Sequence, residues 1–404
     1  MVKMFQAGPP GKSIKSDCQV CYTPGSEPLK IEIESKVQAL FSKTIRDLAE
    51  SSFTKLGIAS GSVQIKDFGA LPFVMMAQIE TVVKRAHPEL VSMSLLPEFK
   101  QHAQYKTTRG RFRRSRLYLP GNQPKLFLNA GIHRPDCIIL DLEDSVPPSE
   151  KDAARHIVRN ALRTLDFFES ERLVRINQGE LGMLDLEAIV PHNVHVILLP
   201  KAETAEQVIA MDHKVREILK REGIDRPVYY MPILESALGV LNAREIALAS
   251  KFNIALAMGL EDYTADIGTE RTLEGTESFF ARSMLVNAAR AAGIQPIATV
   301  FSDVSNEAAL RANVREAKAL GFDGMGCIHP RQIKPIHEEF APNAATVEQA
   351  KRIILAADDA QARGLGVVAV GSKMIDPPVV KRAERTIRMA VDIGMLPESW
   401  KLEV

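Results

Sequence analysis

The sequence predicts an α/β protein built on a (β/α)8 TIM barrel, with a small α+β domain before it and a helical extension after it. From about residue 113 onward, short apolar runs rich in β-branched residues alternate with helical stretches rich in Ala, Glu, Lys and Arg. Strands that are apolar throughout are typical of parallel strands covered by helices on both faces. Such a barrel typically needs about 250 residues, and the eight strand candidates span a similar length. They are residues 117–119, 137–142, 173–176, 194–199, 228–234, 254–258, 296–300 and 324–328.

Residues 1–88 have the pattern of a separate small domain. Apolar and charged residues alternate over 29–33, which predicts a half-buried strand, and a second strand is predicted over 62–66. Between them, residues 36–56 have the spacing of an amphipathic helix. We therefore expect a mixed sheet with a helix packed on one face.

The remaining boundaries follow from composition. Residues 100–116 contain seven Lys or Arg and no carboxylate, and we take 89–112 as a basic linker. The barrel is then expected over 113–341. The tail, 342–404, carries two further helical patterns and is predicted to be a C-terminal extension or lid, which could cap its own barrel or reach a neighbouring copy.

Composition excludes several classes of protein. The 404 residues carry a formal net charge of +1, so no global field attracts nucleic acid or an anionic membrane, and neither partner is expected. No window has the 18 or more apolar residues of a membrane helix. The 4 cysteines are too few and too scattered for a disulfide framework. We expect a cytoplasmic protein.

Three short motifs resemble functional signatures without their context. The stretch AGPPGKS at 7–13 lacks the first glycine of a phosphate-binding loop and a preceding strand. The triplet DFG at 67–69 has no glycine-rich loop or HRD segment before it. Cys18 and Cys21 have the spacing of half a zinc site, but no second pair follows. None of the three predicts a function.

Polar residues follow five successive predicted strands. In a TIM barrel the carboxyl ends of the strands meet at one face, which carries the active site. The residues are Asp141, Glu143 and Asp144 after the second strand, Arg175 at the third, Lys201 after the fourth, Glu235 after the fifth, and Glu261 and Asp262 after the sixth. Carboxylates with one Arg and one Lys suit a hard divalent cation, most plausibly Mg²⁺. Such a cation could chelate a 2-oxo or 2-hydroxy acid and polarise its oxygen, while the guanidinium stabilises a developing enolate. Lyases and aldolases use this chemistry.

Seven motifs in order resemble the citrate lyase beta chain family, whose relatives include malyl-CoA and citramalyl-CoA lyases. They are RSRLYLPG at 114–121, ILDLEDSV at 139–146, VRIN at 174–177, LPK at 199–201, LESA at 234–237, GLED at 259–262 and IHP at 328–330. The N-terminal domain resembles the citrate lyase gamma chain, the acyl carrier of that complex. Together the two resemblances cover nearly the whole chain.

The resemblance implies a set of roles at the site. Glu235 and Asp262 would hold Mg²⁺, directly or through water. Arg175 would face the thioester carbonyl and stabilise its enolate. Asp376 is similar to the family's catalytic aspartate, which the tail of an adjacent subunit donates, so activity would require an oligomer.

Further residues are implied in supporting roles. Glu143 and Asp144 would orient the residues that contact the metal and substrate. Arg114 and Lys125 would bind the thioester's phosphates or the substrate carboxylate.

The carrier-like domain departs from its family at one position. In the gamma chain, the serine that carries a phosphoribosyl-dephospho-CoA arm lies two residues before an aspartate that corresponds to Asp17, and Lys15 stands there in this sequence. An amine cannot form that phosphodiester. Ser16 and Ser13 flank the position and are the alternative attachment sites; otherwise the domain is a docking platform.

These features predict a Mg²⁺-dependent carbon–carbon lyase of the retro-Claisen type. Its substrate would be a citryl, citramalyl or malyl thioester, carried by CoA or by a protein-bound arm. The expected partners are further copies of the chain, in a trimer or hexamer, and an acyltransferase similar to the citrate lyase alpha chain. Two alternatives stay open: a thioester hydrolase on the same barrel, and a non-catalytic carrier or scaffold subunit of a lyase complex.

Overall fold

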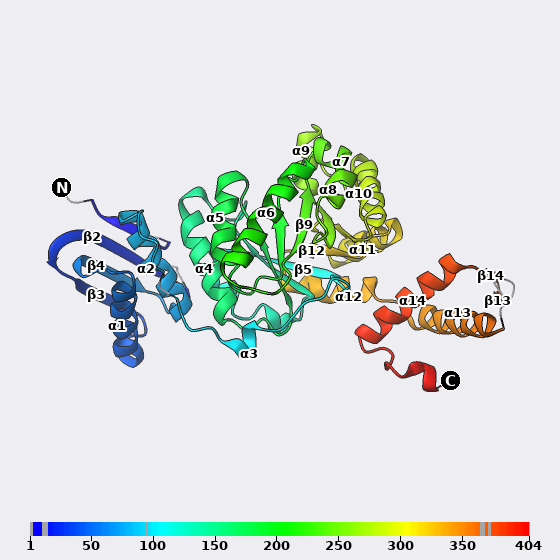
Figure 1. Cartoon of the computed structure of the whole chain (residues 1–404), viewed down its shortest axis with the longest axis horizontal. Helices are drawn as coiled ribbons and strands as arrows, with labels where there is room; N and C mark the ends of the chain where they lie inside the picture. The colour runs from blue at the N-terminus through cyan, green and yellow to red at the C-terminus, as the bar shows by residue number, and fades with distance from the viewer. Residues whose placement is uncertain (1–2, 10–14, 94, 364–367, 371–372, 404) are drawn as a thin grey trace.

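The computed structural model describes residues 3–9, 15–93, 95–363, 368–370 and 373–403. It has three parts in a row along its longest axis: the N-terminal domain at one end, the barrel in the middle and the C-terminal extension at the other end (Figure 1). Within these residues, no helix is long and apolar enough to span a bilayer.

The N-terminal domain contains β1 (Phe5–Ala7), β2 (Cys18–Pro28), β3 (Lys30–Ser35), α1 (Gln38–Lys55), β4 (Ser60–Asp67) and α2 (Pro72–Ala86). The strands form one mixed sheet in the order β1-β2-β4-β3, in which β2 runs antiparallel and β3 parallel to β4. Buried and exposed residues alternate along β4, so one face of the sheet packs inward. The two helices share the core of this domain with that face. The mixed α+β arrangement confirms the predicted class.

The eight predicted strands of the large domain form a closed barrel of parallel strands. They are β5 (Ser115–Pro120), β6 (Cys137–Asp141), β7 (Glu171–Arg175), β8 (Val196–Leu199), β9 (Tyr229–Leu234), β10 (Ala255–Met258), β11 (Gln295–Ala298) and β12 (Gly324–Cys327). The barrel closes where β12 pairs with β5. That closure requires glycine at position 324, because a Cβ atom there would lie 1.9 Å from the carbonyl oxygen of Arg113. The TIM-barrel prediction is confirmed.

Helices cover the outside of the barrel. They are α4 (Lys151–Thr164), α5 (Gly179–Ile189), α6 (Ala205–Arg221), α7 (Ala237–Leu241), α8 (Ala243–Leu248), α9 (Leu260–Asp266), α10 (Phe279–Ala291), α11 (Glu307–Leu320) and α12 (Ile333–Phe340). Residues such as Leu140 and Val174 pack outward into the large core shared with the helices. Alternate residues, such as Ile139 and Leu173, fill the interior. This period of two fixes which strand residues point inward.

The basic linker contains a short helix, α3 (Lys100–Ala103), and the C-terminal extension is a helical hairpin of α13 (Ala344–Ala362) and α14 (Pro377–Asp392). A two-stranded pairing of β13 (Val368–Val370) and β14 (Lys373–Ile375) joins the helices. Arg385 of α14 forms an ion pair with Asp323, which directly precedes β12. The extension therefore docks near the amino-terminal ends of the barrel strands.

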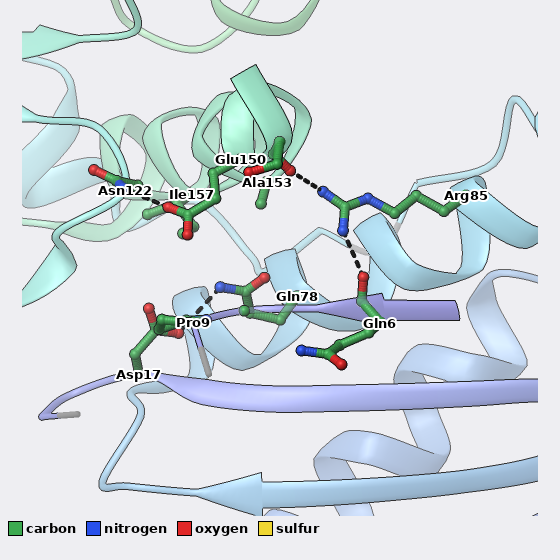
Figure 2. Close-up of a pocket in the computed structure, with 11 residues that line it drawn as sticks. Gln6, Pro9, Asp17, Gln78, Arg85, Asn122, Glu150, Ala153 and Ile157 are labelled. Atoms are coloured by element: carbon green, nitrogen blue, oxygen red, sulfur yellow. Dashed lines mark hydrogen bonds between the residues drawn. The ribbon is translucent and has the colours of Figure 1, made fainter. Parts of the chain in front are cut away.

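The N-terminal domain packs on the barrel through α2 and α4. Glu80 of α2 is fully buried and accepts two hydrogen bonds from Arg159 of α4, at 2.9 and 2.8 Å. Burial alone would raise the pKa of Glu80, but the hydrogen bonds from Arg159 hold it well below its usual range. A second link is Arg85 of α2, which pairs with Asp152 of α4 and donates to the carbonyl of Ser149. Figure 2 shows that Arg85 also donates to the carbonyl of Gln6 in its own domain. The two domains thus share a buried polar interface.

We expect Arg159→Met to lower the free energy of unfolding by about 3 to 5 kcal/mol, because it removes the bidentate partner of the buried Glu80 carboxylate. Urea unfolding followed by circular dichroism measures the loss. Lys30→Met is the matched control, since Lys30 and its partner Glu32 form an exposed ion pair, and it should leave the midpoint unchanged. Equal midpoints for Arg159→Met and the wild type would contradict this prediction.

Candidate active site

Side chains from the carboxyl ends of the barrel strands enclose a cavity of about 340 Å³. Arg175 is the last residue of β7, Glu235 directly follows β9, and Asp262 lies near the start of α9, after β10. All three line this cavity. Glu143 and Asp144 lie at its edge, where both form ion pairs with Arg175. The structure therefore brings these five predicted residues together.

Arg175 is held by two carboxylates. Its Nε and Nη2 donate to the two oxygens of Asp141 at 2.6 and 2.8 Å, and its Nη1 lies 2.9 Å from Glu143 Oε2. Burial alone would raise the pKa of Asp141, but the hydrogen bonds and charge of Arg175 keep it below its usual range. The guanidinium also lies over the ring of Tyr118, 5.5 Å from its centroid. Its position is thus set before any ligand binds.

Lys201 links the carboxylates of the site. It follows β8 in a left-handed backbone conformation, with a φ of 47°. Its Nζ lies 3.4 Å from Glu143, 3.5 Å from Asp144 and 3.6 Å from Asp262. Burial opposes the charge of Lys201, but these three carboxylates raise its pKa above the usual value. Lys201 therefore stays protonated and offsets part of the negative charge.

Glu143, whose Oε2 is also buried without a hydrogen-bond partner among the described residues, pairs with Arg175 and Lys201, whereas Glu235 forms no ion pair in that part of the chain. Glu235 is only 4% exposed, and its Oε2 is buried without a hydrogen-bond partner in the described part of the chain. Burial is the main cause that raises the pKa of Glu235 to about 8. The negative charges of Glu143 and Asp262 also raise it, whereas the positive charges of Arg175 and Lys201 lower it. Gly259 makes room for this side chain, since a Cβ atom there would lie 2.6 Å from Glu235 Cγ. A buried carboxylate oxygen without a donor is suited to a cation.

The donor set fits Mg²⁺ better than a transition metal. Mg²⁺ is commonly held by one or two carboxylates and completes its shell with water and substrate oxygens. Glu235 and Asp262 are two carboxylates that line one cavity. Among the described residues, no group of three or more His, Cys, Asp or Glu could hold a metal by itself. The site therefore needs oxygens from water or from a ligand.

Other predicted residues lie elsewhere. Arg114 precedes β5 at the opposite end of the barrel, where it forms a bidentate pair with Asp136 at 2.9 and 2.8 Å. Arg114 does not line the cavity, and its role in substrate binding stays a prediction. Lys125 follows β5 on the active face, is exposed, and does not line the cavity.

Asp376 is the N-cap of α14, where its side chain accepts from the backbone N–H of Val379. It lies nine residues before Arg385, which is about 14 Å along the helix axis. Because Arg385 contacts the amino-terminal end of the barrel, Asp376 is remote from the cavity of its own chain.

The two candidate attachment serines belong to the N-terminal domain. Ser16 has a φ of 57°, and its N–H donates to the carbonyl of Phe68 at 3.2 Å. Ser13 lies outside the described residues.

Two cavity residues were not identified from the sequence: Arg116 and Tyr118, which line the cavity from β5. Arg116 is 1% exposed, and its Nη1 lies 2.9 Å from the sulfur of Met231. The period of two along β5 could have identified Arg116 and Tyr118 as neighbours on one face of the strand.

Comparisons with known proteins show the family to which the barrel belongs. A family model described as HpcH/HpaI aldolase/citrate lyase matches residues 114–330, and one described as malonate decarboxylase delta subunit (MdcD) matches residues 7–86. Citrate lyase subunit beta of Haemophilus influenzae is 44% identical over 69% of this chain and 97% of its own length. Mitochondrial citramalyl-CoA lyase of Homo sapiens is 32% identical over 70% of this chain and 86% of its own. The crystal structure of Mycobacterium tuberculosis CitE with magnesium, acetoacetate and coenzyme A is 31% identical, with a TM-score of 0.57, over 70% of this chain and 99% of that one.

The pKa of Glu235 predicts a pH-dependent stability. Between the ordinary value of 4.5 and the raised value of about 8, the folded protein holds a proton that the unfolded chain releases. The stabilisation that this proton provides is complete at low pH and is lost as the pH rises through about 8. Without metal, the wild type should lose up to about 1.4 kcal/mol of stability per pH unit from this group between pH 6 and 8.

Glu235→Gln cannot titrate, so its stability relative to the wild type should increase from pH 6 to 8. Urea unfolding in EDTA at pH 6, 7 and 8 measures both proteins. Glu245→Gln, an exposed residue of α8, should follow the wild type at each pH. A Glu235→Gln curve parallel to that of the wild type would contradict the prediction.

Proposed function

We propose, on the premise that this chain belongs to the HpcH/HpaI aldolase/citrate lyase family of carbon–carbon lyases, that it cleaves a 3-hydroxy-carboxyacyl thioester in a Mg²⁺-dependent retro-Claisen reaction. The substrate would be of the citryl, citramalyl or malyl type. The observation that carries the proposal is the buried, unpartnered oxygen of Glu235 in the same cavity as the fixed guanidinium of Arg175. The relative from M. tuberculosis is described in complex with magnesium, acetoacetate and coenzyme A, which supports the same chemistry.

In this proposal Glu235 and Asp262 hold the cation, and Lys201 limits the charge that remains on Asp262. Bound Mg²⁺ would supply Lewis acidity at the 2-oxo and carboxylate oxygens of the leaving acid. Glu143 and Asp144 act through Lys201 and Arg175, which they orient by ion pairs. They are positioning residues in this account.

Arg175 would stabilise the second product. In the reaction the proton of the 3-hydroxyl passes to solvent water, its oxygen becomes the oxo oxygen, and the bond to the neighbouring methylene carbon breaks. The electron pair moves onto the thioester as an enolate, which a proton then converts into the acetyl thioester. A guanidinium fixed by Asp141 and Glu143 can donate to the enolate oxygen without reorganising.

The proton for the acetyl carbon would come from Asp376 of a neighbouring copy in a homo-oligomer. Support comes from the position of Asp376 within one chain, where the extension docks at the end of the barrel opposite to the cavity. In Figure 1 the α13–α14 hairpin projects away from the barrel. A projecting segment that cannot reach its own site is suited to a neighbour's.

The N-terminal domain would present a thioester arm on Ser16 or Ser13, loaded by a separate acyltransferase similar to the citrate lyase alpha chain. Asp17, Gly8 and Pro9 line a cavity of about 280 Å³ together with Asn122 and Glu150 of the barrel. Figure 2 shows these barrel residues facing Gln78 and Asp17 across that cavity. Because Asn122 and Glu150 follow β5 and β6, this part of the carrier-like domain lies toward the active face, which favours transfer within one chain.

A panel of citryl-, citramalyl- and malyl-CoA tests the activity. We expect turnover with Mg²⁺ on at least one of them, loss of turnover in EDTA, and a decrease of at least about 100-fold in Glu235→Gln, because a metal ligand is lost. Glu245→Gln should match the wild type. Release of free CoA without an acetyl thioester would instead identify a hydrolase. No turnover on any member of the panel, while a related lyase is active, would contradict the proposal.

A mixing experiment tests the role of the neighbouring copy. Arg175→Gln and Asp376→Asn should each be nearly inactive alone. When they are co-expressed and purified as mixed oligomers through two affinity tags, activity should return, because some sites then combine an intact Arg175 with an intact Asp376 from the other copy. Mixed oligomers as inactive as the single variants would rule out the contribution in trans.

A further inference from the structure

A second charged cavity lies at the other end of the barrel. Its volume is about 350 Å³, and the linker segment 104–107 lines it. The barrel contributes Arg172 from the start of β7, His195 from directly before β8, and Arg226 from the loop before β9. These residues are at the amino-terminal ends of strands, so the cavity is separate from the candidate active site.

Arg172 is buried with unused hydrogen-bond donors. It is 2% exposed, and its guanidinium stacks on the ring of Tyr105, 4.3 Å from the ring centroid. Its Nε and Nη1 are buried and have no hydrogen-bond partner in the described part of the chain. A buried donor left without an acceptor costs about 1 to 3 kcal/mol, and a charged one costs more.

The contact with His195 does not give Nη2, the third nitrogen of the Arg172 guanidinium, a hydrogen-bond acceptor. His195 Nδ1 accepts from the backbone N–H of Arg172 at 3.1 Å, so the proton of the neutral ring is on Nε2. Nε2 then donates to the carbonyl of Tyr105 at 2.9 Å and has no lone pair for Arg172 Nη2, although the two nitrogens are 3.0 Å apart. Burial and the charge of Arg172 lower the pKa of His195 to about 3, which agrees with a neutral ring. Only a long contact, 3.5 Å to the Tyr105 carbonyl, remains for Nη2.

The surroundings add positive charge. Arg226 donates to the carbonyls of Val194 and Val190, and burial and the charge of Arg172 lower its pKa to about 10. Lys106 lines the cavity from the exposed linker.

Two carboxylates lie near these cations. Asp225 is the carboxylate that lines the cavity, and Glu98, which accepts from Asn193, is close enough to act on the pKa of Arg172 and Arg226. In the described part of the chain, Nε and Nη1 of Arg172 have no hydrogen-bond partner, and Arg226 donates to backbone carbonyls. Three cations thus face one lining carboxylate.

We propose that this cavity binds a small oxyanion, a phosphate or carboxylate group, which accepts from one free donor of Arg172 and pairs with Lys106. Arg226 adds charge, and Tyr105 holds the guanidinium plane by stacking. Nε and Nη1 are on different edges of the guanidinium, because Cδ is on the Nη1 side of Nε, so the oxyanion accepts one charge-assisted hydrogen bond from Arg172 and makes its second contact with Lys106. The site is independent of the proposed lyase reaction, because none of its residues lines the candidate active site.

Calorimetric titration of the full chain in EDTA, at constant ionic strength, tests the site with inorganic phosphate and, in a second arm, citrate. We expect at least one of the two anions to bind with a millimolar or lower Kd. The anion that binds more tightly shows whether the site prefers phosphate groups or carboxylate groups. Lys106→Gln removes an exposed charge and should weaken binding about tenfold, as expected for the loss of one charge-assisted contact. Arg172→Gln should abolish it.

Lys220→Gln, an exposed residue of α6, is the matched control and should bind as the wild type does. If Arg172→Gln does not fold, the comparison of Lys106→Gln with Lys220→Gln still decides. Equal affinities of the wild type and Lys106→Gln would place the anion elsewhere and overturn the proposal. No binding of either anion at 10 mM or below would show a water-filled cavity and would also overturn it.

Discussion

The clamp on Arg175 is the interaction on which the candidate site depends. The register of β6 and β7 places Asp141 directly opposite Arg175, and the carboxylate holds the guanidinium through two hydrogen bonds. Glu143, two residues further along, approaches the same guanidinium and also contacts Lys201. These pairs offset part of the charge of Glu143, although burial still raises its pKa. Glu235 forms no ion pair in the described part of the chain, and burial raises its pKa to about 8. The arrangement therefore creates one position for an added cation beside one fixed donor.

Much of this arrangement could be predicted from sequence because it follows from local rules. Apolar runs of four to six residues identify strands that are buried on both faces, and polar residues directly after them belong to the active face of a barrel. Arg175, Glu235 and Asp262 were identified in this way, and the structure brings them into one cavity. The closed order of eight strands also followed from the number of alternating segments.

What could not be predicted depends on contacts between distant segments. Arg114 belongs to a motif at the active-site strand β5, but it stands one residue before that strand and so lies at the opposite end. Lys201 reaches its three carboxylates because of a left-handed backbone conformation that no pattern signals. The pairing of Glu80 with Arg159 joins residues 79 positions apart on two domains. None of these has a periodic signature.

The claim that a cation binds between Glu235 and Asp262 is tested most directly by diffraction from crystals grown with Mn²⁺ in place of Mg²⁺. Anomalous scattering locates the ion without reference to activity. We predict one strong peak in the cavity at the carboxyl ends of the strands, within about 2.3 Å of a Glu235 oxygen. Asp262 should contact the same ion directly or through one water molecule. A cavity without a peak at saturating Mn²⁺, or a peak bound only by other residues, would contradict it.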